Sequence, residues 1–148
     1  MEIRRVRGEP TEMAGWARMR ADLWPDTMLE EHQAEMTELL SHPQEAAFVA
    51  AGDDGQLKGF AEASIRRDYV EGCATQHVGY LEGWYVIPEA RRKGVGRALV
   101  LAVEAWAREQ GCVEMGSDTE LENMVSQLAH GRLGYEEAAR IVHFRKTL

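Results

Sequence analysis

The chain has 148 residues, of which 45% are hydrophobic and 28% charged, a length and balance that indicate one soluble globular domain over residues 1–148. With 17 Lys and Arg against 25 Asp and Glu, the net charge of -8 argues against nucleic acid as a partner and favours small cationic molecules, although it would also serve solubility. Residues 1–7 lack an apolar stretch of signal-peptide length and residues 98–103 are too short to cross a bilayer, so we expect a cytoplasmic protein with no membrane partner.

The N-terminal part of the chain predicts one strand followed by two helices. Residues 3–7 are expected to form the strand, and residues 13–23 and 28–41 the helices. Side chains of the first helix recur at steps of three and four residues, a stripe typical of a helix face turned toward the core. The members of this stripe are Met13, Trp16, Ala17, Arg20, Leu23 and Trp24.

The middle of the chain predicts three strands. Residues 46–51 and 57–66 are expected to pair as a hairpin, because Gly52-Asp53-Asp54-Gly55 between them tolerates the positive φ angles of tight turns. The third strand, residues 78–87, follows a loop that contains Asp68, Tyr69 and Gly72.

The C-terminal part predicts a helix, a strand, a second helix and a last strand. The first helix, residues 95–110, stops at Gly111, and a strand at residues 112–116 follows. Asp118 and Thr119 are expected to cap the second helix, which ends at Gly134, before a last strand at residues 138–146. The expected buried stripe of the second helix consists of Leu121, Val125, Leu128 and Ala129. Strands and helices in this order predict an α/β layer with a mixed sheet.

Two cysteines, Cys73 and Cys112, are expected to be reduced thiols, because no export signal is evident. Neither has metal-ligand spacing to any of the five histidines, so no metal site is predicted.

Four cations and two glycines gather where the helix at residues 95–110 begins, in the segment Arg91-Arg92-Lys93-Gly94-Val95-Gly96-Arg97. The first turn of a helix leaves backbone N–H groups without intrahelical partners, and glycine lets an anion approach the backbone closely. The segment therefore predicts a diphosphate site. The simpler alternative is a solvated helix start with a basic turn.

The glycine spacing disfavours two common phosphate loops. No Ser or Thr follows Gly94 or Gly96 as a Walker loop requires, and Leu99 stands where a Rossmann loop requires a third glycine. The pattern Arg91-x-x-Gly94-x-Gly96, placed after a strand, instead resembles the acetyl-coenzyme A pyrophosphate loop of the GNAT superfamily of N-acetyltransferases. The second half of the GNAT signature is resembled by Asn123, Leu133, Gly134 and Tyr135. This resemblance implies the GNAT fold, a mixed and mostly antiparallel sheet flanked by helices.

Fragments spread over nearly the whole chain resemble one group within that superfamily, the aminoglycoside 6′-N-acetyltransferases. These fragments are Leu23-Trp24-Pro25, Ala63-Ser64-Ile65-Arg66-Arg67-Asp68-Tyr69-Val70, Leu81-Glu82-Gly83, Ser117-Asp118-Thr119 and Phe144-Arg145-Lys146. The resemblance implies acetyl transfer from acetyl-coenzyme A to the 6′ amine of a polycationic aminoglycoside antibiotic, and it implies a homodimer.

The resemblance also assigns residues to the two binding sites. Drug contacts fall on Trp24, Tyr69, Glu82 and Asp118. Coenzyme contacts fall on Trp84, Tyr85 and Val86 for the pantetheine, on residues 91–97 for the pyrophosphate, and on Asn123. One position departs from the family: related enzymes have an acidic residue that meets the drug near the start of the last strand, and this sequence has Ala139 there. The departure concerns the range of drugs and not the reaction type.

Acetyl transfer requires a neutral amine, whereas a pocket of carboxylates favours the ammonium form. For an amine with a pKa of about 10.4, neutralisation at pH 7 costs roughly 4.6 kcal/mol, so a proton acceptor is needed. We predict Glu82 as that acceptor and Asp118 as a carboxylate that holds the drug. The alternatives are a solvent-facing strand residue for Glu82 and a helix N-cap for Asp118. Trp24 and Tyr69 either form an aromatic rim or belong to the core.

The thioester oxygen gains negative charge during the attack, and a backbone N–H from residues 84–86 is the expected donor. His130 stands where many superfamily members have a tyrosine that protonates the departing thiolate. A histidine can cycle its proton near neutrality, but a thiolate with a pKa near 8.5 also leaves unaided. His130 is therefore either a catalytic proton donor or a helix residue packed beside the coenzyme.

Two other functions stay open at this level. One is acetylation of a different amine, such as a polyamine or a protein lysine. The other is a non-catalytic acyl-coenzyme A binding module, against which the joint presence of Glu82, Asp118 and a complete basic turn argues.

Overall fold

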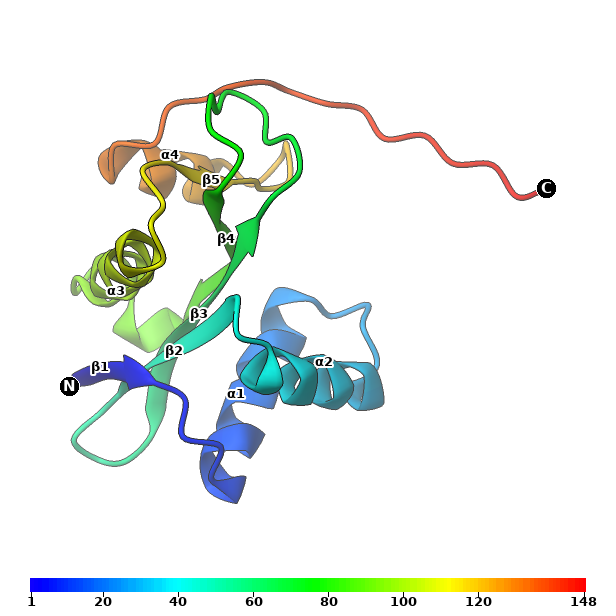
Figure 1. Cartoon of the computed structure of the whole chain (residues 1–148). Coiled ribbons are helices and arrows are strands. Elements are labelled where there is room, and N and C mark those ends of the chain that lie inside the picture. The colour runs from blue at the N-terminus through cyan, green and yellow to red at the C-terminus, as the bar shows by residue number, and fades with distance from the viewer.

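Five strands form a single sheet in the order in which they occur in the chain, in a computed structural model that describes residues 1–148 (Figure 1). Strands β1 to β4 pair with one another antiparallel, and β4 pairs with β5 in parallel. The elements are β1 (Glu2–Arg5), α1 (Pro10–Leu23), α2 (Leu29–Ser41), β2 (Glu45–Ala51), β3 (Leu57–Arg66), β4 (Val78–Val86), the short 3-10 helix η1 (Pro88–Ala90), α3 (Val95–Glu109), β5 (Met115–Ser117) and α4 (Met124–Arg132).

Helices cover the two faces of the sheet with separate cores. On one face, α1 and α2 pack Trp16 and Met36 against Phe60 of β3. On the other face, α3 packs Leu99 and Val103 against the small side chains of β2 and β3. Figure 1 shows α1 and α2 on one side of the strands and α3 on the other. Strands β2 and β3 supply buried side chains to both cores.

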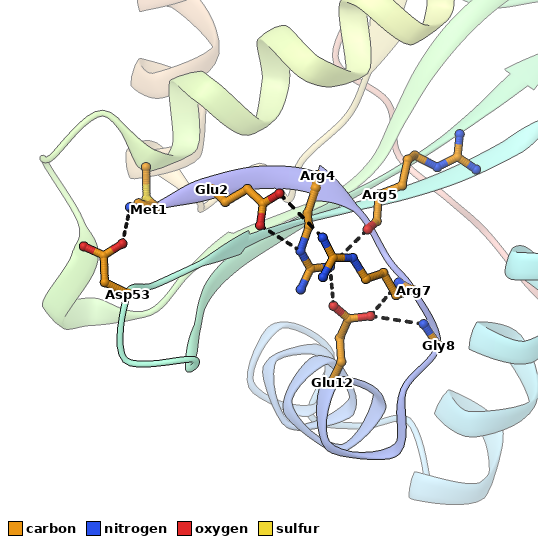
Figure 2. Close-up of polar contacts among 8 residues, drawn as sticks. All are labelled: Met1, Glu2, Arg4, Arg5, Arg7, Gly8, Glu12 and Asp53. Carbon is orange, nitrogen blue, oxygen red and sulfur yellow. Dashed lines mark hydrogen bonds and ion pairs between the residues drawn. The ribbon is translucent and has the colours of Figure 1, made fainter.

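A buried carboxylate fixes the point at which α1 begins. Glu12 accepts hydrogen bonds from the backbone N–H groups of Arg7, at 2.6 Å, and Gly8, at 3.1 Å, and its other oxygen pairs with Arg4 of β1 (Figure 2). Burial by itself would raise the pKa of Glu12, but these hydrogen bonds outweigh it and hold the pKa below its usual value. Helix α1 is thereby tied to the sheet, and with it Trp16, Arg20 and the residues that follow.

A β-bulge interrupts β4 in the middle of the sheet. Glu62 of β3 pairs with Gly83, and the next residue of β3, Ala63, pairs with Leu81. Glu82 is therefore the extra residue of the bulge, and it lies on the same face of the sheet as α1 and α2, where its side chain lines a cavity.

The first eight predicted elements are confirmed, with differences only at their ends, and the strand at residues 57–66 has the predicted bounds. Two predictions near the C-terminus are wrong. The predicted strand over residues 138–146 is absent, because residues 136–148 form neither helix nor strand and run away from the sheet (Figure 1). A strand needs a neighbour for its backbone groups, and the segment meets none within this chain.

The second wrong prediction concerns the start and the packing of the last helix. Helix α4 begins at Met124 and is capped by Asn123, whose side chain accepts a hydrogen bond from the backbone N–H of Ser126, so Asp118 and Thr119 are not its cap. No residue of α4 is buried, and three of the four residues of the predicted stripe, Leu121, Val125 and Leu128, are exposed, with Val125 at 76%. The helical period was right, but nothing in the single chain covers that face.

Candidate functional site

The sheet opens between β4 and β5. The two strands pair only from Gly79–Met115 to Leu81–Ser117, whereas β4 continues to Val86. The edge of β4 after Leu81 therefore has no neighbouring strand on the β5 side, and backbone polar groups along it are available to a ligand. Trp84, Tyr85 and Val86, the residues expected to contact pantetheine through their backbone, lie in this unpaired stretch.

The predicted basic turn forms a backbone concavity at the start of α3. Arg92 and Gly94 both have positive φ, at 61° and 82°, and Gly94 occupies the N-cap position without any side-chain cap. The first N–H groups of α3 therefore have no protein acceptor, and consecutive residues of this kind make an anion-binding nest. The geometry fits the phosphate groups that the sequence predicted for this turn.

The cations of the turn have unequal surroundings. Arg91 donates from Nε to the carbonyl of Val86 at 2.8 Å, and Lys93 donates from Nζ to the carbonyl of Glu89 at 2.9 Å. Arg92 and Arg97 are exposed, and neither forms a hydrogen bond or an ion pair. Arg92 and Arg97 are thus the cations that a phosphate reaches without breaking a bond, while Arg91 and Lys93 shape the turn.

Gly96 allows Trp84 to pack against the first turn of α3. A Cβ at Gly96 would lie 3.1 Å from the Trp84 indole, and the indole N–H donates to the Gly96 carbonyl at 3.1 Å. A side chain at position 96 would push the indole away, so this glycine joins β4 to the helix that carries the basic turn.

His130 lies at the inner end of the opening between β4 and β5. Its Nδ1 lies 2.7 Å from the carbonyl of Ser126, which can only accept, so Nδ1 carries the proton. Its Nε2 lies 2.8 Å from the hydroxyl of Ser117, which also lies 3.2 Å from the carbonyl of Leu81. The ring contacts Trp84 edge-on, with 5.3 Å between the centroids. The structure therefore brings His130 to the expected coenzyme strand and gives both of its nitrogens a partner.

A cavity of about 560 Å³ opens on the face of the sheet covered by α1 and α2. It lies between α1, α2 and strands β2 to β4, and Trp24 and Glu82 both line it, as the resemblance implied. Five carboxylates line the cavity: Glu35, Glu38, Glu45, Glu62 and Glu82. Such a hollow attracts a polycation and disfavours an anionic substrate.

Glu82 is held by donors of this chain. Its carboxylate accepts two hydrogen bonds from Arg66, at 2.9 and 2.8 Å, and one from the Ser64 hydroxyl at 2.6 Å. The Arg66 guanidinium lies 3.4 Å from the ring centroid of Tyr80, whose hydroxyl donates to Asp118. Arg66 and Tyr80 therefore link Glu82 to Asp118, the two carboxylates that the sequence predicted for the drug site. Burial and the Asp118 carboxylate raise the pKa of Tyr80 above its usual value.

Two residues of the expected sites form hydrogen bonds within the chain. Tyr69 is 80% exposed, donates its hydroxyl hydrogen bond to Glu71, and does not line the cavity. Asn123 caps α4 with its side chain. Ala139 lies in the C-terminal segment outside the sheet, and it follows Ala138, which touches the loop at Gly72.

The floor of the cavity holds functional candidates that sequence reasoning missed. Glu62 is 4% exposed, and its Oε1 accepts a hydrogen bond from the Trp16 indole at 2.9 Å. Arg20 lies 3.4 Å from the same oxygen, pairs with Glu35, and stacks 4.9 Å from the Trp24 ring centroid. The signal that was available is the charged Glu62 between the apolar residues Phe60, Ala61 and Ala63 of its strand.

Two other features of the molecule bear on the sequence predictions. Cys73 and Cys112 are both free, as expected. No helix is both long enough and apolar enough to span a membrane.

The chain is similar to known acetyltransferases over most of its length. A profile of the "Acetyltransferase (GNAT) family" matches residues 16–135. A protein of Klebsiella aerogenes named aminoglycoside N(6′)-acetyltransferase type 1 is 50% identical over 143 residues, which cover 95% of this chain and 93% of the relative. A protein of the same name from Stenotrophomonas maltophilia is 45% identical and covers 94% of this chain and 90% of its own.

Solved structures of similar proteins agree with the fold. The aminoglycoside N-acetyltransferase AAC(6′)-Iy in complex with CoA superposes with a TM-score of 0.92 at 41% identity, over 99% of this chain and 95% of the other. The same enzyme in complex with a bisubstrate analogue, CoA-S-monomethyl-acetylneamine, superposes with a TM-score of 0.91, over 99% of this chain and 98% of the other. The predicted fold class is confirmed.

Proposed function

Because the chain belongs to the acetyltransferase (GNAT) family, we propose that it is an aminoglycoside 6′-N-acetyltransferase, which moves the acetyl group of acetyl-coenzyme A to the 6′ amine of an aminoglycoside. The observation that carries this proposal is a pair of binding regions of opposite electrostatic character on either side of β4. An anion-binding turn leads into the opening beside β4, and a cavity lined by five carboxylates lies behind the bulge of the same strand. Antibiotic resistance is the phenotype that this activity would give.

Acetyl-coenzyme A supplies the acetyl group as a thioester when it is bound. The residues that fit it are those of the turn, with the N–H groups of α3 and the side chains of Arg92 and Arg97 for the phosphates. The unpaired edge of β4 at residues 84–86 holds the pantetheine, and one of its N–H groups stabilises the oxyanion that forms as the amine attacks. No metal takes part in this proposal.

The drug enters the acidic cavity with its ammonium groups toward the carboxylates. Trp24 provides an aromatic wall, and its ring is held in place by Arg20 on one side and by Gly83 below, where a Cβ would lie only 2.5 Å from the indole. Glu82 and Asp118 hold amines of the drug, and Arg66 moves aside or shares Glu82 with them.

We assign His130 a positioning role, because both of its ring nitrogens already have partners in this chain, the Ser126 carbonyl at Nδ1 and the Ser117 hydroxyl at Nε2. It fixes Ser117 and Trp84 at the inner end of the opening. His130→Ala is expected to raise KM for acetyl-coenzyme A several-fold and to leave kcat near that of the wild type. A large loss of kcat with an unchanged KM for acetyl-coenzyme A would instead assign to His130 the role of proton donor.

We also propose a homodimer in which the C-terminal segment of each chain packs on the other. Residues 136–148 lie away from the sheet, with Phe144 at 92% exposure, and α4 exposes an apolar stripe that nothing in the chain covers. The outer edge of β5 is also unpaired, because β5 is the last strand of the sheet. A second copy of the segment would satisfy both the strand edge and the stripe. The cytoplasm is the proposed location, which the two free cysteines support.

The test of the activity is thiol release from acetyl-coenzyme A by the purified full chain. Two aminoglycosides that differ only in carrying an amine or a hydroxyl at 6′ should give release with the amine alone, and the product should gain the mass of one acetyl group. Spermidine and a lysine peptide, assayed in parallel, test the alternative acceptors. Faster turnover of either one than of the 6′-amine drug would replace the proposed substrate. Release with none of the acceptors would favour a binding module.

A further inference from the structure

Glu62 is a buried carboxyl group in the cavity that the roles assigned above leave unused. It lies in β3 and lines the cavity together with Glu82. The indole N–H of Trp16 donates to its Oε1, and Arg20 lies close to the same oxygen. No donor of the chain reaches its Oε2, which is therefore free to accept a proton from a ligand.

The bulge in β4 places this carboxyl beside the reaction region. Glu62 pairs across the sheet with Gly83, which lies in the stretch of β4 after Leu81 that has no neighbouring strand on the β5 side. Gly83 has no side chain to stand between them, and the Trp24 ring that covers Gly83 lines the same cavity. An amine that lies against Trp24 and reaches toward the unpaired edge of β4 passes Glu62.

Glu82 is less suited to accepting a proton. Both of its oxygens accept hydrogen bonds from Arg66, and Ser64 donates to one of them. A proton would have to replace one of these donors. Glu82 therefore binds, and the free oxygen of Glu62 makes Glu62 the better acceptor of the two.

We propose that Glu62 is the base that takes the proton of the reacting 6′ ammonium, directly or through one water molecule, an inference that rests on the proposed function. The ammonium R–NH₃⁺ and the Glu62 carboxylate become R–NH₂ and the Glu62 carboxylic acid. The free amine then attacks the thioester carbon, the C–S bond breaks, and the nitrogen loses its second proton as the thiol leaves. Glu62 returns its proton to solvent before the next turnover, so one proton is released for each amide formed.

The surroundings of Glu62 suit a base that works near neutral pH. Burial raises the pKa of Glu62 to about 7, against the opposing effects of Arg20 and Trp16 from α1. Glu35 from α2 and Glu45 from β2 raise it further, and Glu82 faces the cavity from β4. A base is most effective when its pKa lies near the working pH, because it is then ionised and still holds the proton well.

The decisive experiment compares pH profiles of kcat/KM for a 6′-amine aminoglycoside. For Glu62→Gln, we expect kcat/KM at pH 7 to fall by about 100-fold, the usual size of a general-base contribution. The deficit should shrink as pH rises toward the pKa of the amine, because free amine then becomes available without a base. The wild-type limb that titrates near pH 7 should vanish. Glutamine keeps an acceptor for Trp16, and Glu35 still pairs with Arg20, so the fold should persist.

Two further variants make the result specific. Trp16→Phe removes a hydrogen bond to the ionised carboxylate, so it should move the limb to higher pH without abolishing it. Glu45→Gln removes another carboxylate of the same cavity, and it should keep the limb even where it changes the KM for the drug. Calorimetry without coenzyme should show the drug bound to Glu62→Gln with a Kd within about three-fold of wild type, since the role concerns proton transfer rather than affinity.

Each outcome decides between the alternatives. Three outcomes would overturn the inference and leave the acetylation of aminoglycosides intact. Glu62→Gln could keep the limb, Glu62→Gln could show the same deficit at every pH, or the limb could be lost in Glu82→Gln and not in Glu62→Gln. Failure of the proposed function has a different signature, since the wild-type chain itself would then release no thiol with any 6′-amine drug. An unfolded Glu62→Gln would move the decision to Trp16→Phe, where an unmoved limb contradicts the inference.

Discussion

Some single residues of this site act by the way in which they position a neighbouring residue or are positioned by it. Gly96 is a clear case, because its missing side chain leaves room for the Trp84 indole, which in turn contacts His130. Glu62 is another, since its position across from Gly83 gives a buried carboxyl access to the cavity. Neither relation can be recognised from the residue types alone, because both depend on which strand and helix lie next to each other.

Gly96→Ala should weaken acetyl-coenzyme A binding by about ten-fold and lower the free energy of unfolding by about 1 kcal/mol or more, because the added methyl group overpacks the indole. Isothermal calorimetry and urea unfolding measure the two effects. Gly131→Ala is the matched control. Position 131 lies in α4 with nothing within 4 Å of an added Cβ, so alanine should be neutral or stabilise by up to about 1 kcal/mol. Equal effects of the two substitutions would contradict the packing argument.

The free energy of unfolding should depend on pH because the pKa of Glu62 is raised in the folded chain. Its pKa is about 7 in the folded chain against an ordinary value of 4.5, so the folded state binds more protons between these values. The free energy of unfolding should therefore fall as pH rises through this window, by an amount on the order of 3 kcal/mol, and then level off. Glu62→Gln should not show this fall. Urea unfolding of both proteins from pH 4.5 to pH 8 measures the difference, and a difference independent of pH would mean that Glu62 is ionised throughout.

At the scale of elements, two interruptions of regular structure build the site. The bulge in β4 turns Glu82 toward the cavity, and the short β5 leaves the rest of β4 without a partner. The third feature is the start of α3, where Gly94 occupies the N-cap position without a side-chain cap. Sequence patterns predicted both strands and the helix, but the divergence of β4 from β5 depends on where the pairing stops.

Reversing the free cations of the turn should weaken the coenzyme site. In Arg92→Glu/Arg97→Glu, the Kd for acetyl-coenzyme A should rise by at least ten-fold, and the salt dependence of binding should decrease, because both side chains are exposed and unpaired beside the α3 N-terminus. Arg18→Glu is the control: it makes the same charge reversal at one residue on the exposed face of α1, away from the turn. It should leave the Kd for acetyl-coenzyme A within about two-fold of the wild type. Binding that survives the double reversal would remove this turn as the phosphate site.

At the scale of the whole molecule, no part of the chain covers the apolar side chains near the C-terminus. Exposed apolar residues gather on α4 and on the last residues of the chain, among them Val125, Leu128, Val142 and Phe144. A stable monomer seldom exposes so many large apolar side chains in neighbouring segments.

The wild-type chain should sediment as a dimer, and Val142→Asp/Phe144→Asp should sediment as a monomer, because two buried carboxylates cannot be accommodated in an apolar contact. Ala34→Asp, on the exposed surface of α2, adds the same kind of charge and should leave the dimer intact. Analytical ultracentrifugation at several concentrations measures the mass. A wild-type monomer, or a dimer that persists in the double variant, would contradict the proposed contact.

The sequence by itself determined the order of the elements through β5 and the basic turn before α3, and it predicted acidic residues for the proposed drug site. Hydrophobic period, turn residues and glycine spacing are local properties, and they can be recognised without knowing which elements meet. The sequence also identified Trp24 and Glu82 by resemblance, and both line the cavity.

Only the tertiary structure decided what each polar group faces. Arg66 and Ser64 donate to Glu82, Tyr80 donates to Asp118, and Asn123 caps α4. The buried Glu62 accepts from Trp16 at one carboxyl oxygen and keeps the other free. Strand pairing brings these groups together from distant parts of the chain, and no local pattern encodes it. The last predicted strand was wrong for the same reason, because a strand exists only where another strand supplies its hydrogen bonds.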